Sequence, residues 1–263
     1  MRTLLLKTLY DKRWFALGWA AIIGGITLLV MTFYPTFSET NALSQISASV
    51  PEQFKRLVGD EASFRSVPSF IGTQLYEIRI PLLIMIMALV LAQSLSIGEE
   101  EKGLLRIMTT TPMSRSRILW ERWCAGVIII GLVNLATIIG TLIGAVIVGE
   151  TAPLDLVLRL AVMSCLFGIV AFSIPYAVGV ASGHRGLTMS IGLLITFGSF
   201  LLTTFAAAVE WLKPTEHLSL LHYYDTKTIV DGSFNTGDVM LLITIVTVSM
   251  LVATSFFRQR DIN

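Results

Sequence analysis

The sequence has little charge. Charged residues make up only 14% of its 263 residues, whereas hydrophobic residues make up 54%. Because soluble domains carry about 25% charged residues, this balance excludes an ordinary water-soluble protein and indicates that most of the chain lies in lipid. The 19 Lys and Arg residues nearly match the 18 Asp and Glu residues. The chain therefore has no excess of positive charge that would suggest a nucleic acid as a partner.

Signatures of built-in chemistry are also missing. The sequence contains no GxxxxGK[ST] motif, so we expect no phosphate loop for a nucleotide in this chain. It contains no HExxH and no GxSxG, the usual motifs of zinc proteases and serine hydrolases. Its two cysteines and three histidines form no zinc-binding spacing, and we interpret the histidines as widely separated. We expect no catalytic site, no metal and no cofactor bound by this chain itself.

What the sequence does contain is six long apolar runs, at residues 14–34, 78–97, 123–148, 154–181, 187–209 and 239–257. Each is close to or above the roughly 20 residues that a helix needs to cross a bilayer. No water inside the bilayer can satisfy free peptide groups, and the alternation of barrel strands is absent, so the runs must be helices. The prediction is an all-α integral membrane protein with one transmembrane domain over residues 1–263.

The distribution of basic residues predicts the orientation. Lys and Arg near short loops stay on the cytoplasmic side of a membrane. An inside N-terminus places 12 of the 19 basic residues in the cytoplasm, namely Arg2, Lys7, Lys12, Arg13, Lys102, Arg106, Arg115, Arg117, Arg122, Arg185, Arg258 and Arg260. We therefore predict a multi-pass protein of the cell (inner or plasma) membrane with both termini in the cytoplasm.

A short apolar pattern precedes the first run. Leu5, Leu6, Leu9 and Tyr10 recur at helical spacing, which favours an N-terminal helix that lies along the membrane interface. The alternative is a positively charged flank that only fixes the topology.

The connection between the second and third runs is acidic and then apolar. Its distinctive residues are Glu99, Glu100, Glu101, Gly103, Leu104, Leu105, Arg106 and Met108. Carboxylates are favourable at the N-terminus of a helix, and Leu104, Leu105 and Met108 would form an apolar ridge on the following turns. Such a ridge needs a partner, so the pattern predicts a short cytoplasmic helix that docks on another protein. On the residues alone, a solvated charge run at the end of a membrane helix is an equal alternative.

These residues carry a resemblance to a known family. Glutamates leaving the second run, a glycine, an apolar pair, Pro112 and basic residues entering the third run resemble the signature of type 2 ABC exporter permeases. The family more often has threonine at the position of Leu104 and glutamate at that of Arg106. The stretch from Leu221 to Tyr224, followed by Asp231 and Gly232, is also similar to the family.

The resemblance implies a function and partners. In such permeases the loop after the second span is a coupling helix that fits a groove on a separate cytoplasmic ATPase. It implies an ATP-driven exporter in which two permease copies, or one copy and a related permease, form the substrate pathway. Two ATPase subunits would bind ATP and Mg²⁺ on the cytoplasmic side.

Within the apolar runs we find no confident buried charge of the kind that ion-driven transporters need. The other polar residues of these runs are uncharged. They are Gln93, Asn134, Thr137, Ser164, Ser173, Ser190, Thr196 and Ser199. Of these, Gln93, Asn134, Ser173 and Thr196 are our candidates for the pathway or for hydrogen bonds between helices, and we favour bonds between helices. The GxxxG spacing of Gly140 and Gly144 favours close helix packing, within one subunit or between two.

Two other classes of function compete with export. A membrane enzyme would need polar catalytic groups at one depth, which the sequence does not supply. An ATPase-coupled membrane protein that transmits force or confers immunity would keep the same fold without transport.

Overall fold

The computed structural model describes residues 4–39, 66–96, 114–205, 212, 215 and 217–259. Across these residues the secondary structure is helical, without a strand. The elements in chain order are α1 (Leu4–Asp11), α2 (Arg13–Thr32), α3 (Tyr34–Glu39), α6 (Val67–Phe70), the π-helical segment η2 (Ile71–Glu77), α7 (Arg79–Ser96), α9 (Arg115–Ile147), α10 (Leu154–Ser182), α11 (Arg185–Phe205), the 3₁₀ turn η4 (Leu220–Tyr223), α12 (Thr226–Val230) and α13 (Thr236–Gln259).

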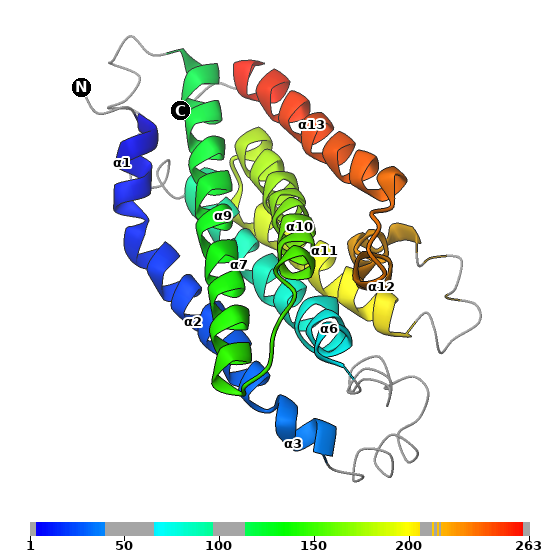
Figure 1. The fold of residues 1–263 in the computed structure, drawn as a ribbon. Coiled ribbons are helices and arrows are strands. Elements are labelled where there is room, and N and C mark those ends of the chain that lie inside the picture. The colour runs from blue at the N-terminus through cyan, green and yellow to red at the C-terminus, as the bar shows by residue number, and fades with distance from the viewer. Residues whose placement is uncertain are drawn as a thin grey trace.

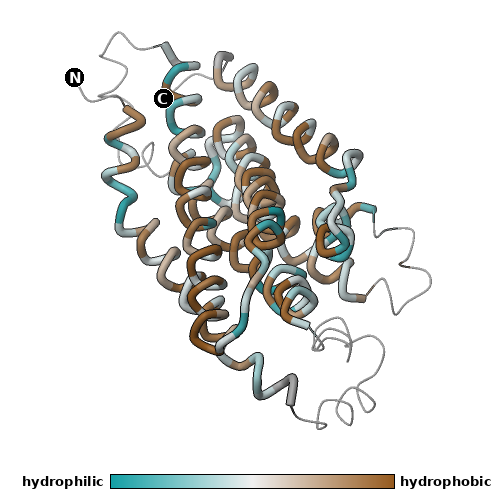
Figure 2. The backbone as a smooth tube through the Cα atoms, in the orientation of Figure 1, coloured by the Kyte–Doolittle hydropathy of each residue, from teal (hydrophilic) through white to brown (hydrophobic). Residues whose placement is uncertain are grey.

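Six helices are long and apolar enough to cross a membrane, which confirms the predicted fold class. They are Arg13–Thr36, Val67–Ser96, Ser116–Ile147, Leu154–Ser182, Arg185–Phe205 and Thr236–Phe257. Hydrophobic residues follow the length of these helices, and hydrophilic residues gather toward ends such as the start of α9 (Figure 2). This pattern is typical of helices whose middle parts contact lipid.

The six helices run up and down through the molecule (Figure 1). At one end lie α1, the end of α7, the start of α9 and the end of α13; we name this the α1 end. At the opposite end lie α3, α6, the α9–α10 connection and α12; we name this the α12 end. This alternation is what six consecutive crossings require.

Two helices begin well before the start of the apolar runs that predicted them. The second spanning helix begins at Val67 rather than at 78, because Ser66 caps it by accepting a hydrogen bond from Ser69 N. The added turns contain Gln74, whose side-chain oxygen accepts a hydrogen bond of 2.6 Å from the Arg79 guanidinium and whose carbonyl accepts another. The third begins at Arg115 rather than 123, since its polar first turns extend beyond the apolar part.

The core lies around α10, which packs against α7, α9, α11 and α13. Its Phe167, Phe172 and Tyr176 are among the largest fully buried side chains. The Tyr176 hydroxyl donates to the Leu119 carbonyl of α9 at 2.9 Å, so a polar group of the central helix is satisfied by a neighbouring one.

The predicted GxxxG spacing lies at the contact between α2 and α9. A Cβ at Gly140 would stand 2.2 Å from Thr27 Oγ1 and 2.4 Å from the Gly24 carbonyl oxygen. A Cβ at Gly144 would stand 2.5 Å from Met31 Cβ. The two glycines thus allow close packing within the subunit, the first of the two alternatives.

Candidate functional site

The predicted coupling residues Glu99, Glu100, Glu101, Gly103, Leu104, Leu105, Arg106 and Met108 lie outside the described residues. The structure does describe the helices on both sides of them. Ser96 ends α7 and Arg115 begins α9, both at the α1 end (Figure 1). The segment 97–113 therefore connects two helices that end at the same side of the bundle.

One end of α1 is bound to α9 through a carboxylate. Glu121 Oε2 accepts a hydrogen bond of 3.0 Å from Leu5 N, and Arg117 Nε lies 2.7 Å from Glu121 Oε1. The first amides of a helix have no partner inside the helix and carry partial positive charge, so a carboxylate there is stabilising. Glu121 thus joins α1 to the first turns of α9.

The other end of α1 is bound to α7. Lys12, which follows α1, donates from Nζ to Ser94 Oγ near the end of α7. Thr8 is buried on the same short helix, and its hydroxyl donates a hydrogen bond of 2.9 Å to the Leu4 carbonyl. The helix α1 consequently bridges the two helices that bracket the segment 97–113.

A buried arginine lies close to this bridge in the sequence. Arg122, counted above as a basic residue flanking a span, is only 4% exposed. A buried guanidinium is stable only when its environment supplies acceptors or opposite charge. Arg122 is therefore packed among the helices of the α1 end and is not a solvated flanking residue.

Among the candidate polar residues, Ser173 has a defined role in helix packing. Its Oγ accepts a hydrogen bond of 2.9 Å from Trp123 Nε1, which joins α10 to α9. Asn134 lies on α9 beside Thr137, whose hydroxyl donates to the Asn134 carbonyl at 2.7 Å. Thr137 Oγ1 is also 3.3 Å from the hydroxyl of the fully buried Tyr76 on η2. The Trp123–Ser173 and Tyr76–Thr137 contacts join different helices of one subunit, whereas the Thr137–Asn134 bond lies within α9.

The remaining candidates are not gathered into one polar site. Gln93 on α7 and Thr196 on α11 are buried, at 8% and 3% exposure. Within the described parts of the chain, Gln93 Nε2 and Asn134 Nδ2 have no hydrogen-bond partner, and neither does Ser164 Oγ. Ser199 instead binds the connection after α11: its Oγ accepts from Leu220 N at 3.1 Å, and its carbonyl accepts from Ser219 Oγ at 2.9 Å.

A pocket of about 320 Å³ lies at the α12 end, between the end of η2, the end of α11, the segment 221–227 and the start of α13. The helix α12 comes close to η2 because Gly72 has no side chain: a Cβ there would stand 2.5 Å from Val230 Cγ2. Arg159 on α10 donates to the Gly232 carbonyl at 3.0 Å and fixes the turn after α12. The pocket wall is thus built from segments far apart in the sequence.

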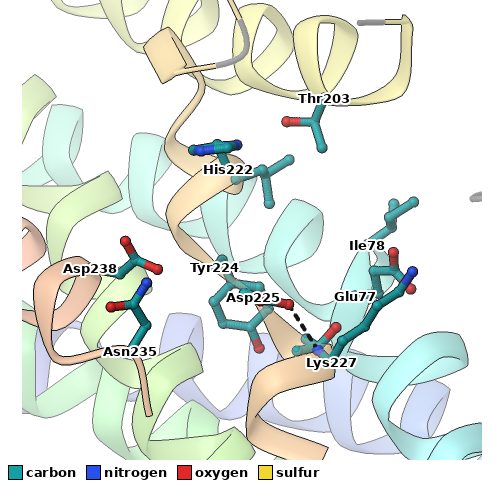
Figure 3. A pocket seen from close by; sticks show the side chains of 11 residues that line it. Glu77, Ile78, Thr203, His222, Tyr224, Asp225, Lys227, Asn235 and Asp238 are labelled. Atoms are coloured by element: carbon teal, nitrogen blue, oxygen red, sulfur yellow. Dashed lines mark hydrogen bonds between the residues drawn. The ribbon is translucent and has the colours of Figure 1, made fainter. Parts of the chain in front are cut away.

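Most of the charged side chains in the wall of this pocket are acidic. Glu77, Asp225 and Asp238 contribute carboxylates, and Lys227 contributes one ammonium group. Figure 3 shows the Lys227 side chain extending toward Glu77. Asp225 caps α12 by accepting hydrogen bonds from Lys227 N at 3.0 Å and from Thr228 N at 3.5 Å. The field in the pocket therefore favours a cation over an anion.

Tyr224 closes the inner side of the pocket. It is 4% exposed and its ring packs against that of Phe167, with centroids 5.2 Å apart. Burial raises the pKa of the Tyr224 hydroxyl well above its usual value, so the phenol stays neutral. This residue anchors the segment 217–230 on the central helix α10.

Sequence reasoning missed the residues that join separate elements. No sequence motif marks Glu121, Lys12 or Ser94. The one available signal was the spacing of four residues between Arg117 and Glu121, which is typical of an ion pair on a helix. The proximity of His217 and His222 was missed as well, because their spacing of five fits no helical face. The contacts of Glu121 and Lys12 depend on which turns of distant segments meet, whereas the histidine pair depends on the local fold of the segment 217–222.

The comparison with family models agrees with this architecture. Residues 20–262 match the model described as ABC-2 family transporter protein. A comparison with curated proteins gives no match. The match covers nearly the whole chain, including all six spanning helices except the first residues of the first one. The chain therefore belongs to the ABC-2 transporter family, as a multi-pass membrane component.

Proposed function

We propose that this chain is the permease subunit of an ATP-driven ABC exporter, coupled to separate cytoplasmic ATPase subunits through residues 99–108. Two copies, or one copy and a related permease, form the substrate pathway between them. The α1 end faces the cytoplasm and the α12 end faces the opposite side. The family match and the lack of a phosphate-loop motif in the sequence support this assignment.

The observation that carries the proposal is the attachment of α1 to both helices that bracket the coupling segment. Leu5 N binds Glu121 on α9, and Lys12 binds Ser94 on α7. A force applied to residues 97–113 therefore acts on α7, α9 and α1 together. Such a unit is suited to receive a push from a partner, because its parts are linked at each end of α1.

In energetic terms, the ATPases shift an equilibrium between two conformations of the permease pair. A partner changes this equilibrium only through contacts that differ between the two conformations. The ridge of Leu104, Leu105 and Met108 would supply apolar contact area, and Glu99 to Glu101 would supply charge. ATP and Mg²⁺ belong to the ATPase, since the chain has no motif to hold them.

The outward faces of the spanning helices support an apolar or amphiphilic cargo. On α13, the exposed hydroxyls of Thr244, Thr247 and Ser255 donate to the carbonyls of Met240, Ile243 and Leu251 at 2.7, 2.9 and 2.6 Å. Their hydrogen-bonding capacity is thus met within their own helix. A pathway formed between two such surfaces has a mainly apolar wall.

The coupling role is tested by replacing both Leu104 and Leu105 with aspartate in the full chain. We expect the variant to be inserted and folded but to lose the ATPase that co-purifies with the wild-type protein from its native membranes. Leu218→Asp is the matched control, because Leu218 is 77% exposed at the α12 end. Undiminished ATPase recovery with the double variant would refute the assigned role.

Transport itself is tested in sealed vesicles that contain the permease and its ATPase. ATP-dependent movement of an amphiphilic fluorescent compound supports an exporter. ATPase stimulation without movement of any offered compound supports instead a protein that transmits force.

A further inference from the structure

The two histidines between α11 and α13 form a close pair at the α12 end. His217 Nδ1 lies 3.1 Å from His222 Nε2, and the ring planes are nearly perpendicular, at 86°. Both side chains are accessible, and His222 also lines the acidic pocket (Figure 3). We infer that His217 and His222 form a chelating site for a divalent transition-metal ion such as Zn²⁺ or Ni²⁺.

The spacing of the two nitrogens suits a shared metal ion. Zn²⁺ binds imidazole nitrogen at about 2.0–2.1 Å, so two such ligands in tetrahedral arrangement lie about 3.3 Å apart. The observed 3.1 Å is within a few tenths of an ångström of this value. The ring centroids are only 4.6 Å apart, closer than two rings aligned end to end would be. The nitrogens are therefore angled and not aligned along a single line.

The backbone that carries the pair is fixed by several hydrogen bonds. The Tyr223 hydroxyl donates to the His217 carbonyl at 2.9 Å. Ser219, between the two histidines in the sequence, is buried. Its Oγ lies 2.6 Å from Thr203 Oγ1, within hydrogen-bond distance. Because both imidazoles are already positioned, a metal ion would cost little ordering of the chain on binding.

The surroundings favour a cation, and the ligands select its type. Asp225 and Asp238 line the same pocket as His222 and make its field negative. Imidazole nitrogen suits Zn²⁺, Ni²⁺ and Cu²⁺, whereas Mg²⁺ and Ca²⁺ prefer oxygen ligands. Among the residues that the structure describes, no group of three or more His, Cys, Asp or Glu side chains could hold a metal. Within the described residues the pair thus supplies two ligands, and water would fill the remaining coordination positions.

The test is Zn²⁺ binding by isothermal titration calorimetry to the purified full-length protein carrying an affinity tag without histidine. We expect one Zn²⁺ per chain. Loss of a second-shell partner weakens metal affinity by about 10–100-fold, so loss of a direct ligand in His217→Ala or His222→Ala should cost at least about tenfold. His217→Gln and His222→Gln, which retain a polar side chain, should show the same loss. Mg²⁺ should give no comparable heat.

The third histidine is the matched control. His184 lies in the turn between α10 and α11 at the α1 end, and His184→Ala should bind Zn²⁺ as the wild type does. Equal binding by the His217 and His222 variants would overturn the proposal. So would a loss of binding in Asp238→Asn with both histidine variants unaffected, because the carboxylates would then be the site. Absence of Zn²⁺ binding by the wild type would leave the pair as a hydrogen bond only and overturn it too.

Discussion

Replacing Gly140 with alanine directly tests the contact between α2 and α9. The added Cβ would lie 2.2 Å from Thr27 Oγ1 and 2.4 Å from the Gly24 carbonyl oxygen, far inside van der Waals contact. The Thr27 hydroxyl could rotate away, although it would then lose its hydrogen bond of 2.8 Å to the Gly24 carbonyl. The carbonyl itself belongs to the helix backbone, so relief requires α2 to move away from α9.

The expected magnitude follows from this geometry. Overpacking a close contact typically costs about 1–3 kcal/mol, and a backbone clash belongs at the upper end of that range. Alanine also favours a helix over glycine by about 1 kcal/mol, which partly offsets the loss. Gly131→Ala on the same helix gains the same helix propensity, but its Cβ would meet no atom within 4 Å, so it serves as the control. The difference between the two variants therefore isolates the clash, about 1–3 kcal/mol.

The assay is thermal unfolding of both variants in the same detergent. For a chain of about 150–250 residues, each 1 kcal/mol shifts the midpoint by about 2–4 °C, so Gly140→Ala should melt several degrees below Gly131→Ala. Gly144→Ala should also melt below Gly131→Ala, because its Cβ would lie 2.5 Å from Met31 Cβ, an atom whose position is fixed by the backbone. Equal midpoints for Gly140→Ala and Gly131→Ala would show that α2 does not approach α9 at this position.

Three further substitutions test other contacts. Ser173→Ala removes the acceptor of Trp123 Nε1 and should destabilise the protein by about 1 kcal/mol. This loss is measured as a lower unfolding midpoint, and an unchanged midpoint would mean that the indole has another acceptor. Glu121→Gln removes the negative charge that caps α1. Amide hydrogen exchange at Leu5 and its neighbours should become about fivefold faster, with little effect on the unfolding midpoint. Unchanged exchange would contradict the cap. Gly183→Ala places a Cβ on a residue with a φ of 65° and should lower the stability by about 1–2 kcal/mol. Gly186→Ala is the control, because its Cβ meets no atom within 4 Å. Equal unfolding midpoints for the two variants would contradict the left-handed turn.

The sequence predicted the helices well and their ends less well. Apolar runs report the part of a helix that contacts lipid, and all six predicted runs correspond to spanning helices. They carry no information on how far a helix continues into the interface, which depends on caps such as Ser66 and on polar turns such as those after Arg115. Residues 206–209 of the fifth predicted run lie outside the described residues.

The candidate site could be predicted only where its signal is local in the sequence. The leucine spacing before Lys12 predicted a short helix, and α1 is present at Leu4–Asp11. Its attachment to Glu121 could not be predicted, because it depends on which turn of α9 meets α1, 116 positions along the chain. The acidic pocket combines Glu77 with Asp225 and Asp238 for the same reason. The coupling function of residues 99–108 stays a prediction.

The attachments of α1 determine how a push from an ATPase would spread. The helix α9 packs along α2, and α7 packs along the central helix α10. If α7 and α9 separated by more than the flexible Lys12 side chain can follow, the bonds from Leu5 to Glu121 and from Lys12 to Ser94 could not both persist. Keeping both bonds requires α7, α9 and α1 to shift as one body. The proposed transmission is therefore a displacement of the whole α1 end, and the contacts of α7 and α9 with α10 are where that body would move against the rest of the subunit.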